Sequence, residues 1–322
     1  MSDYLKEKDI WLIGAGYMSI EYSKVLLEMN MPFEVLGRGM KSATEFKKKT
    51  GVAAQAGGIR NFLKQTEELP FAAIVAVSVE QLATATLLLL RKGVKRILVE
   101  KPAGLNLEEL EELNCEAEKQ KADIFVAYNR RFYAPTLKAK EIISEDGGVT
   151  SFNFEFTEWS HIIKDSKIPD IVKKQWFLVN STHVVDLAFF LGGIPKEIKC
   201  YTTGGLSWHP AASIFCGAGV TEQNSLFSYH SNWEAPGRWG VEVLTKKHRL
   251  ILRPLENLYI QKIGSLNYEK VILNDKLDRD FKPGLYNQVE AFLNNPLSSY
   301  LCRLNDHYLM TKNIYTKMCD QK

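Results

Sequence analysis

Cysteine is scarce in this sequence and is not arranged in a metal-binding or disulfide-forming pattern. The 322 residues contain five cysteines with no CxxC pair among them: Cys115, Cys200, Cys216, Cys302 and Cys319. Scattered thiols of this kind are typical of reduced cytoplasmic proteins and argue against a zinc cluster or a disulfide scaffold. We therefore expect a cytoplasmic chain without a metal site.

Long apolar runs are also missing. The two longest, Leu69–Val79 and Leu82–Leu90, are separated by Glu80 and Gln81 and are too short to span a bilayer. The first ten residues, MSDYLKEKDI, lack the apolar core of a signal peptide. We expect a chain that neither crosses a membrane nor carries a secretory leader.

The sequence has no strong excess of one charge and no familiar hydrolytic motif. It contains 41 Lys and Arg against 38 Asp and Glu, and a net charge of +3 over this length is no electrostatic footprint for nucleic acid. No HExxH, GxSxG or P-loop pattern occurs, which excludes metalloproteases, α/β-hydrolases and nucleoside triphosphatases. The hydrophobic share of 45% is that of a globular protein, and the length favours two domains.

Residues 1–127 alternate short apolar runs with helical patterns. A helix is expected over Leu107–Lys121, opened by Asn106 with Glu109 as its capping-box partner. Strands are expected at five places: Ile10–Ile13, Phe33–Leu36, Phe71–Val77, Ile97–Val99 and Ile124–Ala127. Strands that alternate with helices predict βαβ units and a parallel sheet, so this part is assigned to an α/β domain.

Residues 128–322 change to runs of strands with few helices. One amphipathic helix is expected near Thr182–Leu191, and helices return at Leu285–Phe292 and Asp306–Met318. Strands are expected at six places: Val149–Thr157, Lys196–Thr203, Asn224–Ser231, Gly240–Thr245, His248–Arg253 and Leu258–Ile263. This pattern predicts an α+β domain with a mostly antiparallel sheet. Whether the last helices pack back on the first domain stays open.

Two glycines follow the first expected strand and precede the first expected helix. Gly14 allows a tight turn, and Gly16 lets backbone amides approach a pyrophosphate at the helix N-terminus. Ser19 replaces the third glycine of the dinucleotide fingerprint and is small enough for close packing. This context predicts dinucleotide binding, and the alternative is an ordinary glycine turn. The candidate cofactor-binding residues here are Gly14, Ala15, Gly16, Tyr17 and Met18.

The end of the second expected strand lacks the acid that would accept the ribose 2′-hydroxyl of NAD. Glu34 lies inside the strand, and Arg38 stands between Gly37 and Gly39, 38 − 16 = 22 residues after Gly16. An arginine at this place suits a 2′-phosphate. We therefore predict NADP as the favoured cofactor, with NAD also possible. The alternative is a solvent-facing turn arginine.

Three further motifs follow the glycine loop in order. Glu100, Lys101 and Pro102 end a strand, Tyr128–Phe132 reads YNRRF, and Ser181–Asp186 reads STHVVD. Together these motifs resemble the Gfo/Idh/MocA family, which includes glucose–fructose oxidoreductase and myo-inositol dehydrogenase, over nearly the whole chain. The resemblance implies a Rossmann domain, then a substrate-binding and oligomerisation domain with a large open sheet. It also implies hydride transfer between a nicotinamide and a hydroxyl or carbonyl carbon of a sugar, sugar derivative or polyol, in a homodimer or homotetramer.

The resemblance also implies roles for single residues. Lys101 would stabilise negative charge on the reacting oxygen, and His183 would transfer the proton. Ser78 and Glu100 join Lys101 as candidate cofactor-binding residues, and the Lys101–Pro102 peptide bond is expected to be cis, as in relatives. The alternatives are a surface lysine and a helix histidine that its neighbours satisfy.

The sequence departs from the family pattern one helical turn before the histidine. The family commonly has an aspartate at that place, whereas this chain has Val179. Asn180 is one residue off, and Asp186 either holds His183 or simply supports the fold. The departure keeps open a second function, a nicotinamide-dinucleotide sensor or scaffold that has lost turnover.

The remaining candidates are residues that would contact the substrate. His161 and Asn180 belong to the second domain, and Arg238 lies in a turn-rich segment between Trp233 and Trp239. Indole faces stack on sugar rings and arginine binds anions, which predicts a charged or nucleotide-linked sugar. Trp159 and Lys164 are weaker candidates, and the alternative for the arginine segment is a packed hairpin connection.

Overall fold

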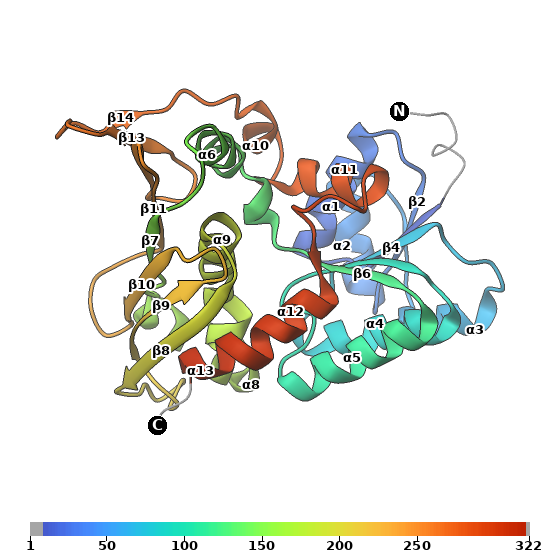
Figure 1. Cartoon of the computed structure of the whole chain (residues 1–322). Coiled ribbons are helices and arrows are strands. Elements are labelled where there is room, and N and C mark those ends of the chain that lie inside the picture. Colours follow the sequence, from blue (N-terminus) through green and yellow to red (C-terminus); the bar gives the residue numbers. More distant parts are fainter. Residues whose placement is uncertain (1–8, 320–322) are drawn as a thin grey trace. The chain divides into compact units, whose positions relative to one another are not determined.

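The chain folds into two compact units, each with its own hydrophobic core. The computed structural model describes residues 9–319, so the prediction about a signal peptide falls almost entirely outside the described residues. The first unit contains the residues up to Tyr128 together with Leu277–Tyr308. The second contains Asn129–Lys276 and the residues from Leu309 onward. Figure 1 labels most of the elements of both units.

The first unit is built on a seven-stranded sheet. Its strands, in spatial order, are β15 (Cys302–Arg303), β6 (Asp123–Val126), β5 (Arg96–Val99), β4 (Ala72–Val75), β1 (Ile10–Ile13), β2 (Phe33–Leu36) and β3 (Ala54–Gln55). All neighbours pair in parallel except β15, which runs antiparallel to β6. Every residue of β1 and β4 is buried, as expected for a parallel sheet that is covered on both faces.

Helices lie on both faces of this sheet. The helices of the unit are α1 (Tyr17–Glu28), α2 (Met40–Thr50), α3 (Gly58–Gln65), α4 (Leu82–Lys92), α5 (Leu107–Gln120), α10 (Lys276–Asp280), α11 (Leu285–Asn294) and α12 (Leu304–Met310), of which α10 has no buried residue. The helices α1 and α11 pack together on one face, and α4 and α5 pack together on the other (Figure 1). The turns at the carboxyl ends of β1, β2 and β3 therefore meet along one edge, where Rossmann ligands bind.

The start of α5 follows the predicted capping pattern. The Asn106 side chain accepts a hydrogen bond from the Glu109 backbone N–H at 2.8 Å, which confirms the cap. The Glu109 carboxylate in turn accepts from the Leu105 N–H at 2.7 Å. The reciprocal bond is therefore made one residue earlier than in the standard capping box.

The second unit is built on an eight-stranded sheet. Its strands, in spatial order, are β14 (Glu269–Lys270), β13 (Tyr259–Lys262), β12 (His248–Leu252), β11 (Gly240–Leu244), β7 (Ser151–Glu155), β10 (Leu226–Asn232), β9 (Ile214–Thr221) and β8 (Pro195–Thr203). The strands β7 and β10 pair in parallel, and the other neighbours pair antiparallel. The predicted fold class, a Rossmann domain and an α+β domain with a large, mostly antiparallel sheet, is confirmed.

The strand β9 is absent from the sequence expectations because its glycines weaken the strand pattern. A Cβ on Gly217 would lie 2.5 Å from the Tyr229 ring, and one on Gly219 would lie 2.6 Å from the Phe227 ring. The glycines of β9 therefore leave room for aromatic rings on the neighbouring strand β10.

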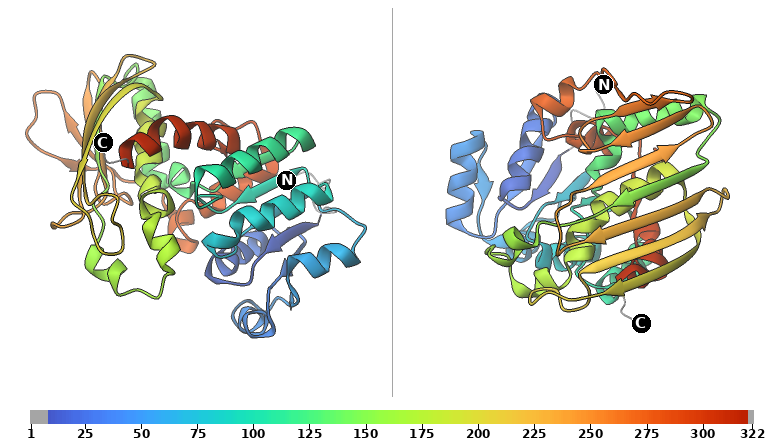
Figure 2. Two further views of the ribbon diagram at one scale, coloured as in Figure 1. Left: turned by 90° about the horizontal axis from the view of Figure 1, so that it is seen from below. Right: turned by 90° about the vertical axis from the view of Figure 1, so that its left-hand side faces the viewer.

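The central helix of the second unit is α9 (Thr182–Gly192). The predicted helix near Thr182–Leu191 is confirmed, but its predicted amphipathic character is wrong. All but two of its residues are buried, and α9 packs against β7 and β11. The other helices are α6 (Ala134–Glu145), α7 (Ser160–Lys164), α8 (Asp170–Lys174) and α13 (Thr316–Cys319), with a 3₁₀ turn at Asn129–Phe132. The sheet face turned to the viewer in Figure 2 (right) carries no helix of the described residues. One face of the sheet is thus packed and the other is open.

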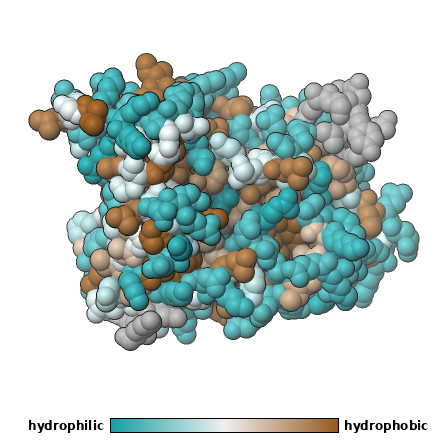
Figure 3. All heavy atoms as spheres, in the orientation of Figure 1, coloured by the Kyte–Doolittle hydropathy of each residue, from teal (hydrophilic) through white to brown (hydrophobic). Residues whose placement is uncertain are grey.

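Exposed apolar side chains gather at the β13–β14 hairpin, where Ile263, Leu266, Tyr268 and Ile272 are exposed. Figure 3 shows brown spheres at this hairpin, whereas elsewhere on the visible face they lie scattered among teal ones. No helix in the described range 9–319 is long and apolar enough to span a bilayer.

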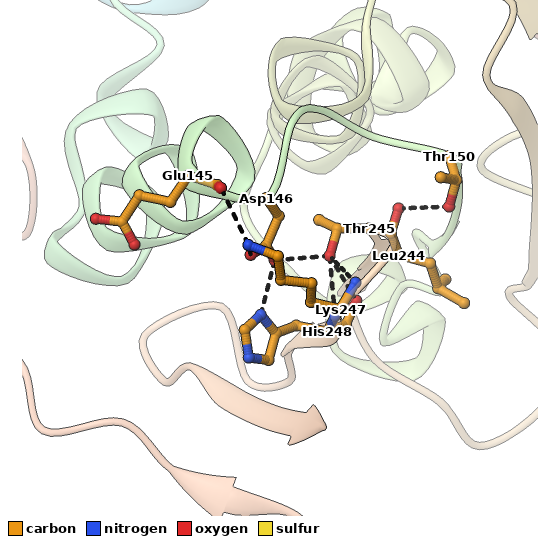
Figure 4. Close-up of polar contacts among 7 residues, drawn as sticks. All are labelled: Glu145, Asp146, Thr150, Leu244, Thr245, Lys247 and His248. Atoms are coloured by element: carbon orange, nitrogen blue, oxygen red, sulfur yellow. Dashed lines mark hydrogen bonds and ion pairs between the residues drawn. The ribbon is translucent and has the colours of Figure 1, made fainter. Parts of the chain in front are cut away.

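A buried carboxylate ties the end of α6 to the β11–β12 turn. Asp146 accepts hydrogen bonds from Thr245 Oγ1 and from His248 Nδ1, both at 2.7 Å, and Lys247 Nζ lies 3.6 Å away (Figure 4). Burial alone would raise the pKa of Asp146, but the bonds from His248 and Thr245 outweigh it and lower the pKa. The ionised carboxylate therefore stabilises this corner of the second unit.

We expect Asp146→Asn to lower the free energy of unfolding by about 1–3 kcal/mol at pH 7, because the amide places N–H groups against hydrogen-bond donors. Because the folded pKa of Asp146 is lowered, its contribution is complete above the unfolded pKa of about 3.9 and disappears as the pH falls through the folded pKa. Urea unfolding at pH 7 and below pH 4 measures both effects. Asp165→Asn is the control, because Asp165 is exposed and forms no ion pair within residues 9–319. Equal stability of Asp146→Asn and wild type at pH 7 would contradict the assignment.

Candidate functional site

A cavity of about 730 Å³ opens at the carboxyl edge of the first unit's sheet. Its walls come from the turns that follow β1, β2, β3 and β4. Seven of the predicted cofactor-binding residues line it: Gly14, Ala15, Gly16, Tyr17, Met18, Arg38 and Ser78. The structure brings these residues together from three separate stretches of the chain, and the cavity is large enough for an extended dinucleotide.

The two glycines of the β1–α1 turn are required for different structural reasons. Gly14 has φ +120°, and a Cβ there would lie 2.3 Å from the Ala76 carbonyl oxygen, so no other residue fits. Ser19 Oγ donates to the same carbonyl at 3.3 Å. Gly16 is the N-cap of α1, and a Cβ there would meet nothing within 4 Å. Its missing side chain leaves open space at the helix N-terminus, which is the space that a pyrophosphate needs.

The end of β2 and the turn after it form another part of the cavity wall. Arg38 lines this wall, whereas the Glu34 carboxylate lies 3.3 Å from the Gln55 amide nitrogen and does not line the cavity. Arg60, in the first turn of α3, lines the same wall. Sequence reasoning missed Arg60, because nothing in the sequence alone indicates that the turn after the short strand β3 reaches the cavity.

Lys101 and Glu100 follow β5, and neither lines the cavity. The Lys101–Pro102 peptide bond is cis, as predicted. The Glu100 carboxylate accepts a hydrogen bond from the Tyr22 phenol at 2.7 Å. Burial raises the pKa of Glu100, although Tyr22, Lys101 and Lys282 favour its charged form. Glu100 is therefore buried inside the first unit, where its carboxylate is hydrogen-bonded to Tyr22.

In the second unit, His183 lies half-buried in the first turn of α9, with its ring centroid 6.2 Å from that of Trp239. Asp186, three residues on, is held by Arg131, whose Nε and Nη2 lie 2.8 and 2.5 Å from the two carboxylate oxygens. In this two-point ion pair, Asp186 is buried and Arg131 is partly buried. Of the two roles left open for Asp186, the structure therefore favours support of the fold.

The carboxylate nearest to the start of α9 is one that sequence reasoning did not single out, Glu158. Asn180 Nδ2 lies 3.1 Å from both of its oxygens, and Ser181 Oγ donates to Oε1 at 2.8 Å. Burial raises the pKa of Glu158, although these bonds and Arg238 favour the charged form. Val179 is buried beside them in a π-helical turn, Phe177–Ser181, of the kind often found at functional sites.

Arg238 lies between two indole rings. Its guanidinium carbon is 4.6 Å from the Trp159 ring and 4.5 Å from the Trp239 ring, and Nη1 is 3.6 Å from Glu158 Oε2. Arg238 and Asn180 therefore share one carboxylate, whereas His161 and Lys164 lie exposed on α7. Trp233 is fully buried in the core and is not part of this stack. In the described part of the chain, no three His, Cys, Asp or Glu side chains form a group that could hold a metal.

The two glycines give a matched test of the turn. We expect Gly14→Ala to destabilise the protein by about 2–5 kcal/mol, because the new Cβ overlaps the Ala76 carbonyl and the backbone has a positive φ. Gly16→Ala should change stability by less than about 1 kcal/mol and yet weaken dinucleotide binding by about tenfold or more. Thermal unfolding and calorimetric titration measure the two effects. Unchanged dinucleotide affinity in Gly16→Ala would show that the ligand does not approach this turn.

Comparisons with known proteins agree with this geometry. Residues 8–128 match the family model of Gfo/Idh/MocA, an oxidoreductase family with an NAD-binding Rossmann fold, and no curated protein matches the chain. Several solved structures share the fold of the whole chain. UDP-N-acetylglucosamine 3-dehydrogenase of Acidithiobacillus ferrooxidans is 13% identical, with a TM-score of 0.74 and coverage of 97% of this chain and 96% of that one.

Two more solved structures extend the comparison. Levoglucosan dehydrogenase in complex with NADH and levoglucosan is 16% identical, with a TM-score of 0.77 and 97% of each chain covered. An oxidoreductase of Agrobacterium radiobacter, in complex with NAD+, L-tartaric acid and magnesium, is 10% identical, with a TM-score of 0.75 and coverage of 97% and 96%. At these identities the likeness shows a shared fold. The family match covers residues 8–128, the segment that contains the glycine turn and its cavity. It confirms that this segment resembles the Gfo/Idh/MocA oxidoreductases with their NAD-binding Rossmann fold.

Proposed function

We propose that this protein is a nicotinamide-dependent oxidoreductase that transfers a hydride between its cofactor and a hydroxyl or carbonyl carbon of a sugar, sugar derivative or polyol. The observation that carries the proposal is the 730 Å³ cavity around the β1–α1 glycine turn, inside the segment that matches the family. Structural neighbours whose names specify levoglucosan and UDP-N-acetylglucosamine support a carbohydrate substrate.

A nicotinamide dinucleotide fits the residues present, because Gly16 leaves open space at the N-terminus of α1. The nicotinamide supplies the hydride acceptor or donor. Lys101 donates a hydrogen bond to the reacting oxygen and stabilises the negative charge that develops there. His183 accepts the hydroxyl proton in oxidation and returns it in reduction. With Val179 next to Asn180 and Asp186 bound to Arg131, this histidine works without the aspartate that the family pattern offers.

Three further assignments go with this function. Residues 1–127 bind the cofactor, and residues 128–322 bind the substrate and form the subunit contacts of a homodimer or homotetramer in the cytoplasm. The open face of the second sheet is the surface that we assign to association (Figure 2). Tyr201 and Leu226 are exposed there, because their strand neighbours Cys200 and Phe227 pack into the core. His161, Asn180 and Arg238 are the assigned substrate-contacting residues.

A dehydrogenase assay against a panel of sugars, followed at 340 nm with NADPH and NADH, tests the activity. The competing function is a sensor that binds the dinucleotide without turnover, and Val179 is the feature that favours it. Tight NADPH binding with no turnover on any sugar would replace the enzyme by the sensor. Failure to bind either dinucleotide would remove both functions.

The cofactor is expected to be NADP, because Arg38 stands where NAD-binding chains carry an acid. NADPH should therefore bind more tightly than NADH in a calorimetric titration. Arg38→Ala should weaken NADPH by about 1.5–3 kcal/mol, the range of a hydrogen bond to a charged group, and leave NADH nearly unchanged. Equal affinities in the wild type, or tighter NADH, would refute the preference.

The two proposed catalytic side chains are tested by removal. Lys101→Ala should reduce kcat by about 10²–10³, the range seen when one donor to a developing oxyanion is lost, with little change in dinucleotide affinity. His183→Ala should lose most turnover. Steady-state kinetics with a substrate from the panel, together with cofactor titration, separates these effects from misfolding. Full activity of either variant would remove that residue from the mechanism.

A further inference from the structure

The wall of the cavity that follows β2 and β3 carries two positive charges and no negative one. Arg38 comes from the β2–α2 turn and Arg60 from the first turn of α3, and both line the cavity. No Asp or Glu is among the residues that line it. Both arginine side chains are exposed, and among residues 9–319 neither guanidinium has a hydrogen-bond or ion-pair partner in the protein. Two unpaired guanidinium groups on one wall suit a ligand group with more than one negative charge.

The two turns that carry these arginines are bonded to each other. The Gly58 N–H donates to the Gly37 carbonyl at 3.0 Å, and the Gly37 N–H donates to the Gln55 carbonyl at 2.8 Å. Asn61 Nδ2 closes the second turn on the Gly57 carbonyl at 3.0 Å. This frame fixes the backbone at the base of both side chains, so the arginines are positioned together rather than by separate loops.

The pyrophosphate of a dinucleotide does not need these charges. Its proposed site is the β1–α1 turn, where Gly16 leaves the N-terminus of α1 open and the backbone amides favour an anion. The acid that would hold a free ribose 2′-hydroxyl is absent from the β2 wall, because Glu34 is directed to Gln55. The remaining anion of a nicotinamide dinucleotide is a phosphomonoester on that ribose.

We propose that Arg38 and Arg60 together form a subsite for the ribose 2′-phosphate, with Arg60 as the second and previously unassigned specificity-determining residue. The inference rests on the proposed cofactor site and extends it from one guanidinium to a pair. Each planar fork offers two parallel N–H groups to phosphate oxygens, so two arginines from different elements can approach the phosphate from two sides.

Calorimetric titration of the full-length protein with two small probes tests the pair. The probes are adenosine 2′,5′-bisphosphate and 5′-AMP, which differ only in the 2′-phosphate. Arg60→Gln should weaken the bisphosphate by about 10- to 100-fold, the fold-change for a lost hydrogen bond to a charged group, and change 5′-AMP by less than about twofold. Lys64→Gln is the control, because Lys64 is an exposed cation on the same helix that does not line the cavity.

The double variant measures whether the two arginines act on one group. Arg38→Gln with Arg60→Gln should bind the bisphosphate no better than 5′-AMP, and the two single losses should be coupled rather than independent. Equal weakening of both probes by Arg60→Gln, or an effect no larger than that of Lys64→Gln, would overturn the inference. Bisphosphate binding that depends on Arg60 in a protein that turns over no sugar would support the subsite and refute the proposed activity.

Discussion

The cofactor half of this protein depends on one steric constraint, the close approach of Gly14 to the Ala76 carbonyl. A Cβ on Gly14 would lie 2.3 Å from that oxygen, and Ser19 Oγ bonds to it at 3.3 Å. The turn after β1 is thereby pressed against the end of β4, which directs α1 across the sheet with its N-terminus at the cavity. Because Gly16 leaves that N-terminus uncovered, the same turn that packs the fold also exposes the amides that favour an anion. Packing and binding are therefore two consequences of one backbone conformation.

In the second unit, a buried carboxylate constrains the local backbone, as the Gly14 contact does in the first unit. Glu158 follows β7 and receives the side chains of Asn180 and Ser181, which end the π-helical turn in front of α9. A buried carboxylate is costly unless its oxygens are hydrogen-bonded, so the turn is held where these donors reach it. His183 follows within two residues of Ser181, and its backbone is fixed by that arrangement. A buried carboxylate therefore lies beside the turn that contains Val179, hydrogen-bonded to the next two residues, Asn180 and Ser181.

Much of the fold can be predicted from the sequence because its signals are local. Continuous apolar runs such as Ile10–Ile13 mark buried parallel strands, and Asn106 with Glu109 marks a helix start. The features that were missed depend on partners distant in sequence. The glycines of β9 weaken its strand pattern in the sequence. Their role is visible only in the structure, where the rings of Tyr229 and Phe227 pack against them. The sequence does not mark Glu158 as special, because its importance comes from burial beside Asn180 in the folded chain. It does not mark Arg60 either, because Arg60 reaches the cavity only when the turns after β2 and β3 are hydrogen-bonded to each other. The spacing of residues in the sequence is therefore enough to predict the glycine turn. The charged residues that line the cavity can be identified only from the folded structure.

Two different parts of the first unit's cavity offer positive charge, the β1–α1 turn and the wall after β2 and β3. The β1–α1 turn offers an anion only backbone amides and the helix dipole, which fall off within one turn of helix. The wall after β2 and β3 offers two full charges on long side chains, fixed at their base by the Gly58–Gly37 hydrogen bond. Amides bind any pyrophosphate at a given distance from the turn, so they set the position of a dinucleotide without distinguishing its kinds. Guanidinium groups without an acid beside them instead discriminate by the charge of the ribose substituent, because an unpaired arginine gains little from a neutral hydroxyl. In the proposed cofactor site, position and selectivity are thus assigned to different elements. A change at the arginines should therefore leave the placement of the rest of the ligand intact.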